Sequence, residues 1–166
     1  MVAIWSSRSY SKPYSLLITD VDEMSRETIR EFFEPDGYNT YMAGSGKEAI
    51  EIARDVLIHA LITDMNLPDI SGLETFRFIK KEFQIVLPCI LLTRNASKEM
   101  LLRAISAEAY AVISKPTNLD VLRFAMKQIM KKYYRGEGEI PGKFTIKGEA
   151  YHEGKTYRGK GLNKET

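Results

Sequence analysis

The sequence has only one cysteine, Cys89, so no disulfide can form within the chain. Cys89 lies in the apolar run "PCILL", where we expect a buried structural thiol, and a chain without disulfides suits a reducing compartment. No apolar stretch reaches the roughly 20 residues that span a bilayer. The start, "MVAIWSSRSYSKP", lacks the continuous apolar core of a signal peptide. We therefore expect a cytoplasmic protein without a membrane partner.

An excess of charge of one sign is also lacking. The 24 Lys and Arg residues and 22 Asp and Glu residues give a net charge of +2, too little to indicate a nucleic-acid or membrane partner. The basic excess lies in residues 134–166, which are rich in Gly and Lys. We expect a basic C-terminal tail, either flexible or folded as a weak hairpin around "KFTIKGEAYHEGKTYRG". Its tyrosines and cations could contact RNA or DNA, but the composition favours a solvated tail without a nucleic-acid partner.

What the sequence does have is five short apolar runs separated by stretches with helical spacing. The runs are "SLLIT", "YNTYMA", "ALIT", "CILLT" and "AYAVIS", at residues 15–19, 38–43, 60–63, 89–93 and 109–114. Helical spacing follows them, over residues 25–33 and 46–55 and from Ser71, Ser97 and Asn118 onward. This alternation predicts an α/β fold with a doubly wound, five-stranded parallel sheet and helices on both faces. Residues 14–133 would form this domain, after an N-terminal extension of residues 1–13.

Ionisable and hydroxyl side chains stand at the carboxyl ends of four runs, where parallel α/β sheets form their functional crevice. Asp20 and Asp22 follow the first run and Asp64 follows the third. Thr93 ends the fourth run and Lys115 follows the fifth. Neighbouring carboxylates repel each other and favour a cation between them, and oxygen ligands of this kind suit Mg²⁺. With Mg²⁺ in place, one carboxylate can attack a phosphoryl group and form an acyl phosphate.

Asp64 is the carboxylate that we expect to act as the nucleophile. It follows a buried apolar run, and the loop after it contains Pro68 and then Gly72, so the loop is stiff and fixes its approach. Lys115 and the hydroxyl of Thr93 would then surround the phosphoryl oxygens, because catalysis of this type depends on positioning and on neutralising charge.

Four segments, "LLITD", "ALITDMNLPDISG", "CILLT" and "VISKP", together resemble the receiver domain of response regulators in two-component signal transduction. The resemblance covers most of the chain and implies a flavodoxin-like receiver fold. It implies that Asp64 is the phosphoacceptor, supplied by a histidine kinase or a phosphotransfer protein. It also implies that Asp20 belongs to the acidic metal pocket and that the backbone carbonyl of Asn66 contacts Mg²⁺. Lys115 would pair with Asp64 and then with the phosphate, to which Thr93 would donate a hydrogen bond.

The sequence departs from the usual receiver pattern at Val21. Receivers usually carry two adjacent acidic residues after the first strand, and the second contacts the metal directly, but this chain reads "DVD". Asp22 either reaches the metal by a local shift or serves only as the N-cap of the first helix. Arg94 stands after Thr93, where a small residue is common, so it could narrow access to Asp64 or contact the phosphate. Two functional readings follow: phosphorylation with a weak Mg²⁺ site, or a degenerate receiver that acts as a phosphorylation-independent binding module.

The leading hypothesis is a stand-alone receiver that signals through protein contacts. Its output face would comprise the fourth helix, the fifth strand and the fifth helix, and a homodimer is a further option. The chain would not be an enzyme in the ordinary sense, since its chemistry would be limited to its own phosphorylation and dephosphorylation at Asp64. One enzymatic alternative remains, because "LLITDVDEM" resembles the strand-end motif of haloacid-dehalogenase-type phosphatases, with Asp20 as nucleophile and Asp22 as acid. Those enzymes have Thr or Val where Glu23 or Met24 stands here.

Overall fold

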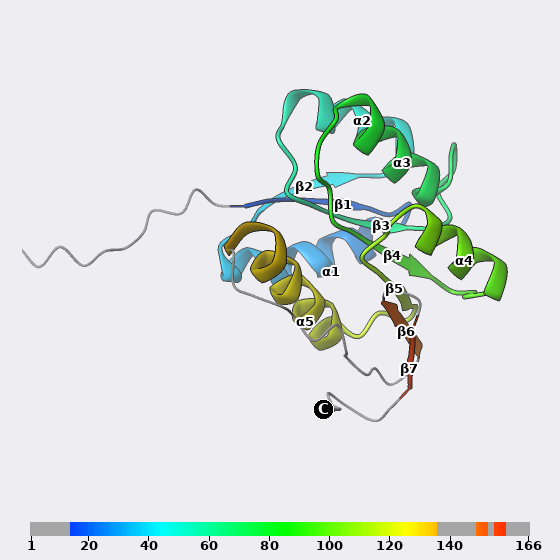
Figure 1. Cartoon of the computed structure of the whole chain (residues 1–166). Helices are drawn as coiled ribbons and strands as arrows, with labels where there is room; N and C mark the ends of the chain where they lie inside the picture. The colour runs from blue at the N-terminus through cyan, green and yellow to red at the C-terminus, as the bar shows by residue number, and fades with distance from the viewer. Residues whose placement is uncertain (1–13, 136–148, 153–154, 159–166) are drawn as a thin grey trace, which may run out of the picture.

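The computed structural model describes residues 14–135, 149–152 and 155–158 and has a central sheet with helices on both faces (Figure 1). The sheet order is β2-β1-β3-β4-β5-β6-β7, and the first five strands in chain order are parallel. The predicted α/β fold is therefore confirmed. The five parallel strands are β1 (Ser15–Thr19), β2 (Asn39–Ala43), β3 (Ala60–Asp64), β4 (Cys89–Thr93) and β5 (Ala111–Ser114). The helices are α1 (Glu23–Phe33), α2 (Gly46–Asp55), α3 (Gly72–Glu82), α4 (Lys98–Ser106) and α5 (Leu119–Met130), with short turns η1 (Glu34–Asp36) and η2 (Lys131–Arg135).

Alternate residues of the central strands face opposite helical layers. Leu16 and Ile18 of β1 pack in one core with α1 and α5, whereas Leu17 packs in a second core with α2, α3 and α4. Because both faces are covered, these strands read as continuous apolar runs rather than as an alternating pattern. Cys89 is fully buried in the second core, as expected, and burial raises the pKa of its thiol well above the usual value.

Polar side chains fix where the helices begin. Helix α1 starts at Glu23, earlier than the predicted Ser25, because the carboxylate of Asp22 accepts hydrogen bonds from N–H groups of the first turn. The structure therefore shows the capping role of Asp22 directly. The other four long helices have caps of the same kind, at Ser45, Ser71, Ser97 and Asn118.

Two antiparallel strands extend the parallel sheet beyond β5. Strand β6 (Glu149–His152) pairs with β5 through Val112 and Ile113, and β7 (Lys155–Arg158) pairs with β6. Both strands fall within the segment of the basic tail in which the sequence predicts a weak hairpin, but the sequence did not predict the pairing of β6 with β5. The rest of that tail beyond Arg135 and the N-terminal extension of residues 1–13 lie outside the described residues. Within the described ranges, no helix has the length and hydropathy needed to cross a membrane.

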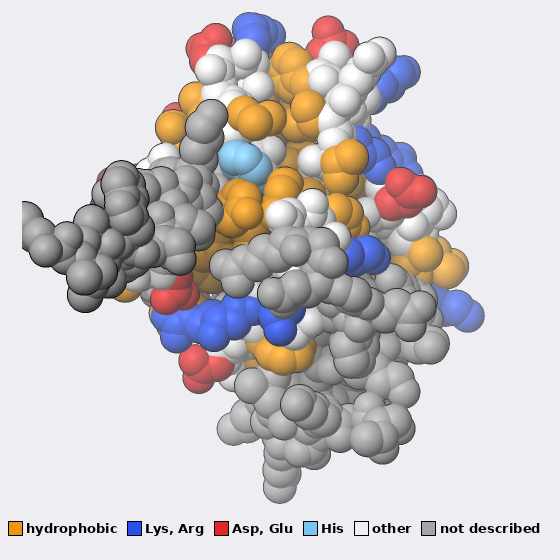
Figure 2. All heavy atoms as spheres, turned by 60° about the vertical axis from the view of Figure 1, so that its left-hand side comes forward, with side chains coloured by type: hydrophobic (Ala, Val, Ile, Leu, Met, Phe, Trp, Pro, Cys, Tyr) orange, Lys and Arg blue, Asp and Glu red, His pale blue; other side chains and the backbone are white. Residues whose placement is uncertain are grey.

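Aromatic side chains pack against one another at the amino ends of β1 and β3. The ring of His59 contacts the rings of Tyr14 and Tyr134, with both centroid distances at 5.2 Å. The Nδ1 atom of His59 accepts a hydrogen bond from the Ser15 N–H at 2.9 Å, and the Tyr134 hydroxyl donates to the His59 carbonyl. Burial lowers the pKa of His59 and raises the pKa of Tyr134 to about 12. Figure 2 shows hydrophobic side chains gathered around a histidine on this face. These contacts give His59 a structural role.

Candidate functional site

The carboxyl ends of four neighbouring strands bring the predicted residues to one edge of the sheet. Asp20 follows β1, Asp64 ends β3, Thr93 ends β4 and Lys115 follows β5. The order β1-β3-β4-β5 makes these strands neighbours. Asp20 is 1% exposed, Thr93 2% and Asp64 6%, and the side chain of Lys115 is 9% exposed. The two carboxylates, the ammonium and the hydroxyl at this site are therefore almost completely buried.

The ammonium of Lys115 lies between the two carboxylates. Its Nζ atom donates a hydrogen bond to Asp20 Oδ2 at 2.8 Å and another to Asp64 Oδ2. Burial alone would lower the pKa of Lys115, but the hydrogen bonds and charges of the two acids outweigh it and raise that pKa. Burial likewise works against the charged form of Asp20, yet hydrogen bonds, first of all that from Lys115, hold its pKa below the usual value. The geometry therefore keeps Lys115 and Asp20 charged at neutral pH.

Hydrogen bonds from the β1–α1 loop and from the first turn of α1 hold Asp20 in place. Its Oδ1 atom accepts from the N–H of Asp22 at 2.9 Å, and its Oδ2 atom accepts from the hydroxyl of Ser25 at 2.9 Å. The guanidinium of Arg26 donates to the carbonyl oxygens of Asp20 and Val21, at 2.6 and 3.3 Å. Sequence reasoning missed Ser25 and Arg26 as parts of the site. Both lie in the first turn of α1, where no motif distinguishes them from ordinary helical residues.

The loop after Asp64 is fixed at several points. The Asn66 N–H donates to Asp64 Oδ1 at 2.8 Å. A Cβ atom on Gly72 would lie only 2.1 Å from the Asp64 carbonyl oxygen, so only glycine allows α3 to start this close to β3. Further along the loop, the carboxylate of Asp69 accepts from the N–H groups of Gly46 and Lys47, at 2.9 and 2.8 Å. The stiff loop predicted from the sequence is thus anchored both to Asp64 and to the start of α2.

The Asp69 carboxylate carries the clearest pKa shift in this loop. Burial works in the opposite direction, but hydrogen bonds from backbone N–H groups, led by that of Lys47, lower its pKa to about 2. The anchor is therefore fully charged at neutral pH.

Thr93 lies at the same edge but does not bond to either acid. Its hydroxyl exchanges hydrogen bonds with the backbone of Asn95, accepting from the N–H and donating to the carbonyl, both at 3.2 Å. The backbone N–H of Lys115 donates to the Thr93 carbonyl at 2.8 Å, and the Lys115–Pro116 peptide bond is cis. These contacts tie the loops after β4 and β5 together beside the carboxylates.

The donor set for a cation consists mainly of two carboxylates. Asp20 and Asp64 supply oxygen atoms of the kind that Mg²⁺ takes, and such sites need only one or two carboxylates besides phosphate and water. Val21 has no donor and is 59% exposed, and the carboxylate of Asp22 is directed at the N–H groups of α1. Among the described residues, no group of three or more His, Cys, Asp or Glu side chains could hold a metal ion. The oxygen ligands therefore suit Mg²⁺, but the site has one carboxylate fewer than a site with two adjacent acidic residues after β1 would have.

An open cavity of about 310 Å³ lies beside Lys115. Arg94 lines it from the loop after β4, and Ser25 and Met24 line it from the start of α1. Arg94 is therefore placed at the approach to the Lys115 side of the site. The other lining residues are Asp22, Thr28, Ile29, Pro116, Thr117 and Leu119.

Comparison with known proteins matches this architecture to one family. The model of the response regulator receiver domain matches residues 16–127. Response regulator RR06 of Streptococcus pneumoniae is 30% identical over 120 residues, which are 72% of this chain and 54% of that protein. The polar-differentiation response regulator DivK of Brucella anthropi is 34% identical over 115 residues, 68% of this chain and 90% of DivK. The chain thus spans about half the length of RR06 but most of DivK.

Solved structures agree on the fold. A CheY-like receiver domain protein from Methanospirillum hungatei superposes with a TM-score of 0.68 at 25% identity, covering 76% of this chain and 99% of that one. Chemotaxis protein CheY4 of Vibrio cholerae gives a TM-score of 0.67 at 23% identity, covering 70% of this chain and 98% of CheY4.

Proposed function

Since this chain belongs to the response regulator receiver domain family, we propose that it accepts a phosphoryl group on Asp64 from a histidine kinase or a phosphotransfer protein. The observation that carries the proposal is the contact of the Lys115 ammonium with the carboxylates of both Asp20 and Asp64, all three of which are almost completely buried. Two acids around one ammonium make a site whose charges can rearrange when a phosphoryl group arrives.

The transfer step would use the carboxylate of Asp64, which accepts hydrogen bonds from Lys115 and from the N–H of Asn66. One of its oxygens attacks phosphorus, the P–N bond of the donor phosphohistidine breaks, and the imidazole leaves and takes a proton from water. The ammonium of Lys115 would turn from the Asp64 carboxylate to a phosphoryl oxygen and would neutralise part of its negative charge. Thr93 would give up its bond to Asn95 and donate to the phosphoryl group, at the cost of one weak local contact.

A magnesium ion would be held by the carboxylates of Asp20 and Asp64 and by the backbone carbonyl of Asn66, and it would neutralise charge on the phosphoryl oxygens. Asp22 could join only by giving up its bonds to the N–H groups of Met24 and Ser25. We therefore assign Mg²⁺ a weak site in this chain.

The signal would leave through α4, β5 and α5 by contact with another protein, or with a second copy of the chain. Leu102 and Ile105 of α4 are 55% and 41% exposed, which gives this face apolar contact area. Because β6 pairs with β5, a partner that binds at this face would also contact β6. Transfer from a cytoplasmic kinase would place the protein in the cytoplasm. The alternative of a phosphorylation-independent module gains no support, since Asp64, Thr93 and Lys115 all lie at the site.

Mass spectrometry of the intact chain tests the proposal. Incubation with acetyl phosphate and Mg²⁺ should add the mass of one phosphoryl group to the wild-type chain and none to Asp64→Asn. Asp69→Asn, in the same loop but away from the pocket, should still be phosphorylated. No added mass under saturating donor, or equal addition to Asp64→Asn, would refute the assignment.

A further inference from the structure

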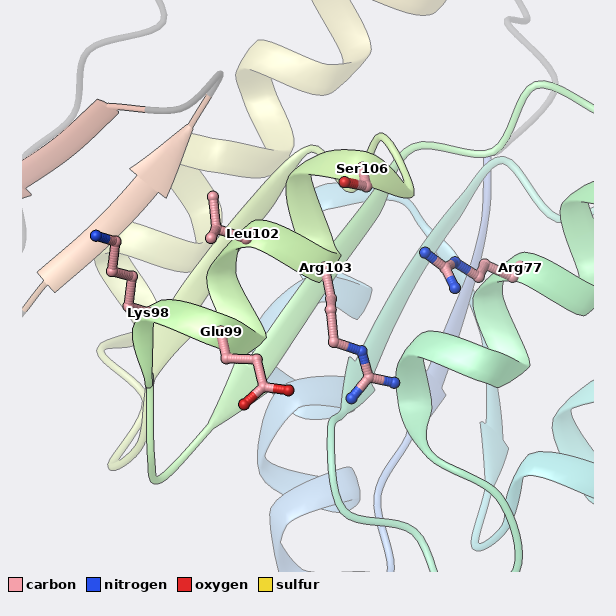
Figure 3. Close-up of a pocket in the computed structure, with 6 residues that line it drawn as sticks. All are labelled: Arg77, Lys98, Glu99, Leu102, Arg103 and Ser106. Carbon is pink, nitrogen blue, oxygen red and sulfur yellow. The ribbon is translucent and has the colours of Figure 1, made fainter.

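A second cavity, of about 580 Å³, lies over the outer side of α4, next to α3. It shares no lining residue with the cavity beside Lys115. Figure 3 shows Arg77 of α3 and Arg103 of α4 pointing into the space between the two helices, with Ser106 above them. Lys98 and Leu102 continue the surface across α4, and Glu99 completes the lining. We call these six residues the α3–α4 groove.

The charges of the α3–α4 groove are not balanced within the fold. Three cations and one carboxylate line it, all four exposed. In the described part of the chain, none of the four takes part in an ion pair. Lys80, one turn after Arg77 on α3, does have partners, because its Nζ atom donates to the Ala107 carbonyl at 2.9 Å and to Glu108 at 3.3 Å. Lys80 is thus paired with residues that follow α4, whereas Arg77 and Arg103 have no ion-pair partner among the described residues.

The groove also offers an apolar contact between its cations. Leu102 is 55% exposed and lies on the α4 surface between Lys98 and Arg103 in sequence and space. Arginine is enriched at protein interfaces, and an exposed apolar side chain bordered by cations has the arrangement of an apolar centre with a polar rim. A nucleic acid would gain less, because none of the six lining residues has an aromatic ring on which a base could stack.

We infer that the α3–α4 groove binds an acidic segment of a partner protein that carries at least one large apolar side chain. Its carboxylates would pair with Arg77 and Arg103, and the apolar side chain would cover Leu102. Arginine suits this role because its planar guanidinium can bind a carboxylate through two hydrogen bonds. The inference goes beyond the proposed phosphorylation at Asp64 and does not depend on it, although Leu102 also belongs to the proposed output face.

An NMR titration of the ¹⁵N-labelled full chain tests the inference. The probe is a twelve-residue peptide of Glu and Ser with one central Leu, blocked at both ends and titrated up to about 1 mM, which detects free energies of roughly −4 kcal/mol or better. Shifts should concentrate on α4 and the second half of α3. Arg77→Glu with Arg103→Glu should weaken binding at least tenfold, and Leu102→Ser should weaken it severalfold. The matched control, Lys47→Glu with Arg54→Glu on α2, should bind like the wild type.

Several results would overturn the inference. They are no binding in this range, shifts centred on other elements, wild-type affinity in the double arginine variant, and equal affinity for a peptide with Ser in place of Leu. Tighter binding of a single-stranded RNA of similar length at the same residues would replace the protein partner by a nucleic acid. Circular dichroism must show that the variants are folded. Phosphorylation by acetyl phosphate should persist in the double arginine variant, so failure at the groove and failure at Asp64 are distinguishable.

Discussion

Replacing Lys115 by methionine removes the only cation that contacts the two site carboxylates in the described residues. Asp20 keeps two of its three hydrogen bonds, from Asp22 and Ser25, and Asp64 keeps the one from Asn66. Breaking a buried ion pair costs roughly 3–5 kcal/mol because the remaining charge has no partner. The remaining hydrogen-bond donors to the two carboxylates and the open cavity beside them favour the lower end of this range. We expect the free energy of unfolding at pH 7 to fall by about 3 kcal/mol.

The pH dependence of this loss follows from the directions of the two pKa shifts. The pKa of Asp20 is lowered, so its contribution is complete above the ordinary value of 3.8 and is lost as the pH falls through the folded value. The pKa of Lys115 is raised, so its contribution is complete below the ordinary value of 10.5 and is lost as the pH rises through the folded value. These two contributions to the stability of the wild type should therefore be constant between these limits. In Lys115→Met one carboxylate will take up a proton more easily, so the deficit should shrink toward pH 5.

Urea unfolding of the wild type and Lys115→Met at pH 7 and pH 5 measures both effects. Lys80→Met is the matched control, because Lys80 pairs with the largely exposed Glu108 and its loss should cost under about 1 kcal/mol. Adding Asp20→Asn to Lys115→Met should restore part of the stability, since only one buried carboxylate then lacks a partner. The reasoning is wrong if Lys115→Met is as stable as the wild type at pH 7, or if Asp20→Asn makes it worse.

Four further predictions concern the site and its loop. Val21→Asp restores a carboxylate beside the pocket and should tighten Mg²⁺ binding at least tenfold by isothermal titration calorimetry; an unchanged affinity would mean that this position does not limit metal binding. Gly72→Ala should cost at least about 2 kcal/mol in urea unfolding, because its Cβ would overlap the Asp64 carbonyl, and near-wild-type stability would contradict the close approach. Asp22→Ala should cost about 1 kcal/mol through the lost helix cap and leave Mg²⁺ affinity unchanged, whereas weaker Mg²⁺ binding would make Asp22 a ligand. Asp69→Asn should be less stable than the wild type above pH 4, and the difference should vanish as the pH falls through about 2, the folded pKa of Asp69; a difference that persists at pH 1.5 would have another cause.

The order of strands and helices could be predicted from the sequence because it depends on local patterns. The apolar runs and the caps Ser97 and Asn118 mark elements that the structure contains. Errors occurred at boundaries, where a specific contact decides. The fifth strand begins at Ala111 rather than at residue 109, because Glu108 has a positive φ of 62° and the chain turns there before it can join the sheet.

The candidate site was predictable only as far as topology determines it. Parallel strands in the order β1-β3-β4-β5 bring their carboxyl ends together, so the convergence of Asp20, Asp64 and Lys115 follows from the fold. The bond from Ser25 to Asp20 depends on a side-chain rotamer, which no sequence pattern encodes. The pairing of β6 with β5 joins segments far apart in sequence through two paired positions, and such a short non-local ladder leaves no periodic signal.

Strand β3 connects the candidate site at its carboxyl end with the contact between His59 and Tyr134 at its amino end. Its last residue is Asp64, and the residue before its first is His59, whose carbonyl accepts the hydroxyl of Tyr134 from the turn that continues α5. Five extended residues span about 17 Å, and this rod is fully buried between two helical layers. The position of the acid that we assign as phosphoacceptor and the place where the chain departs from its last helix are thus set by one and the same stretch of backbone.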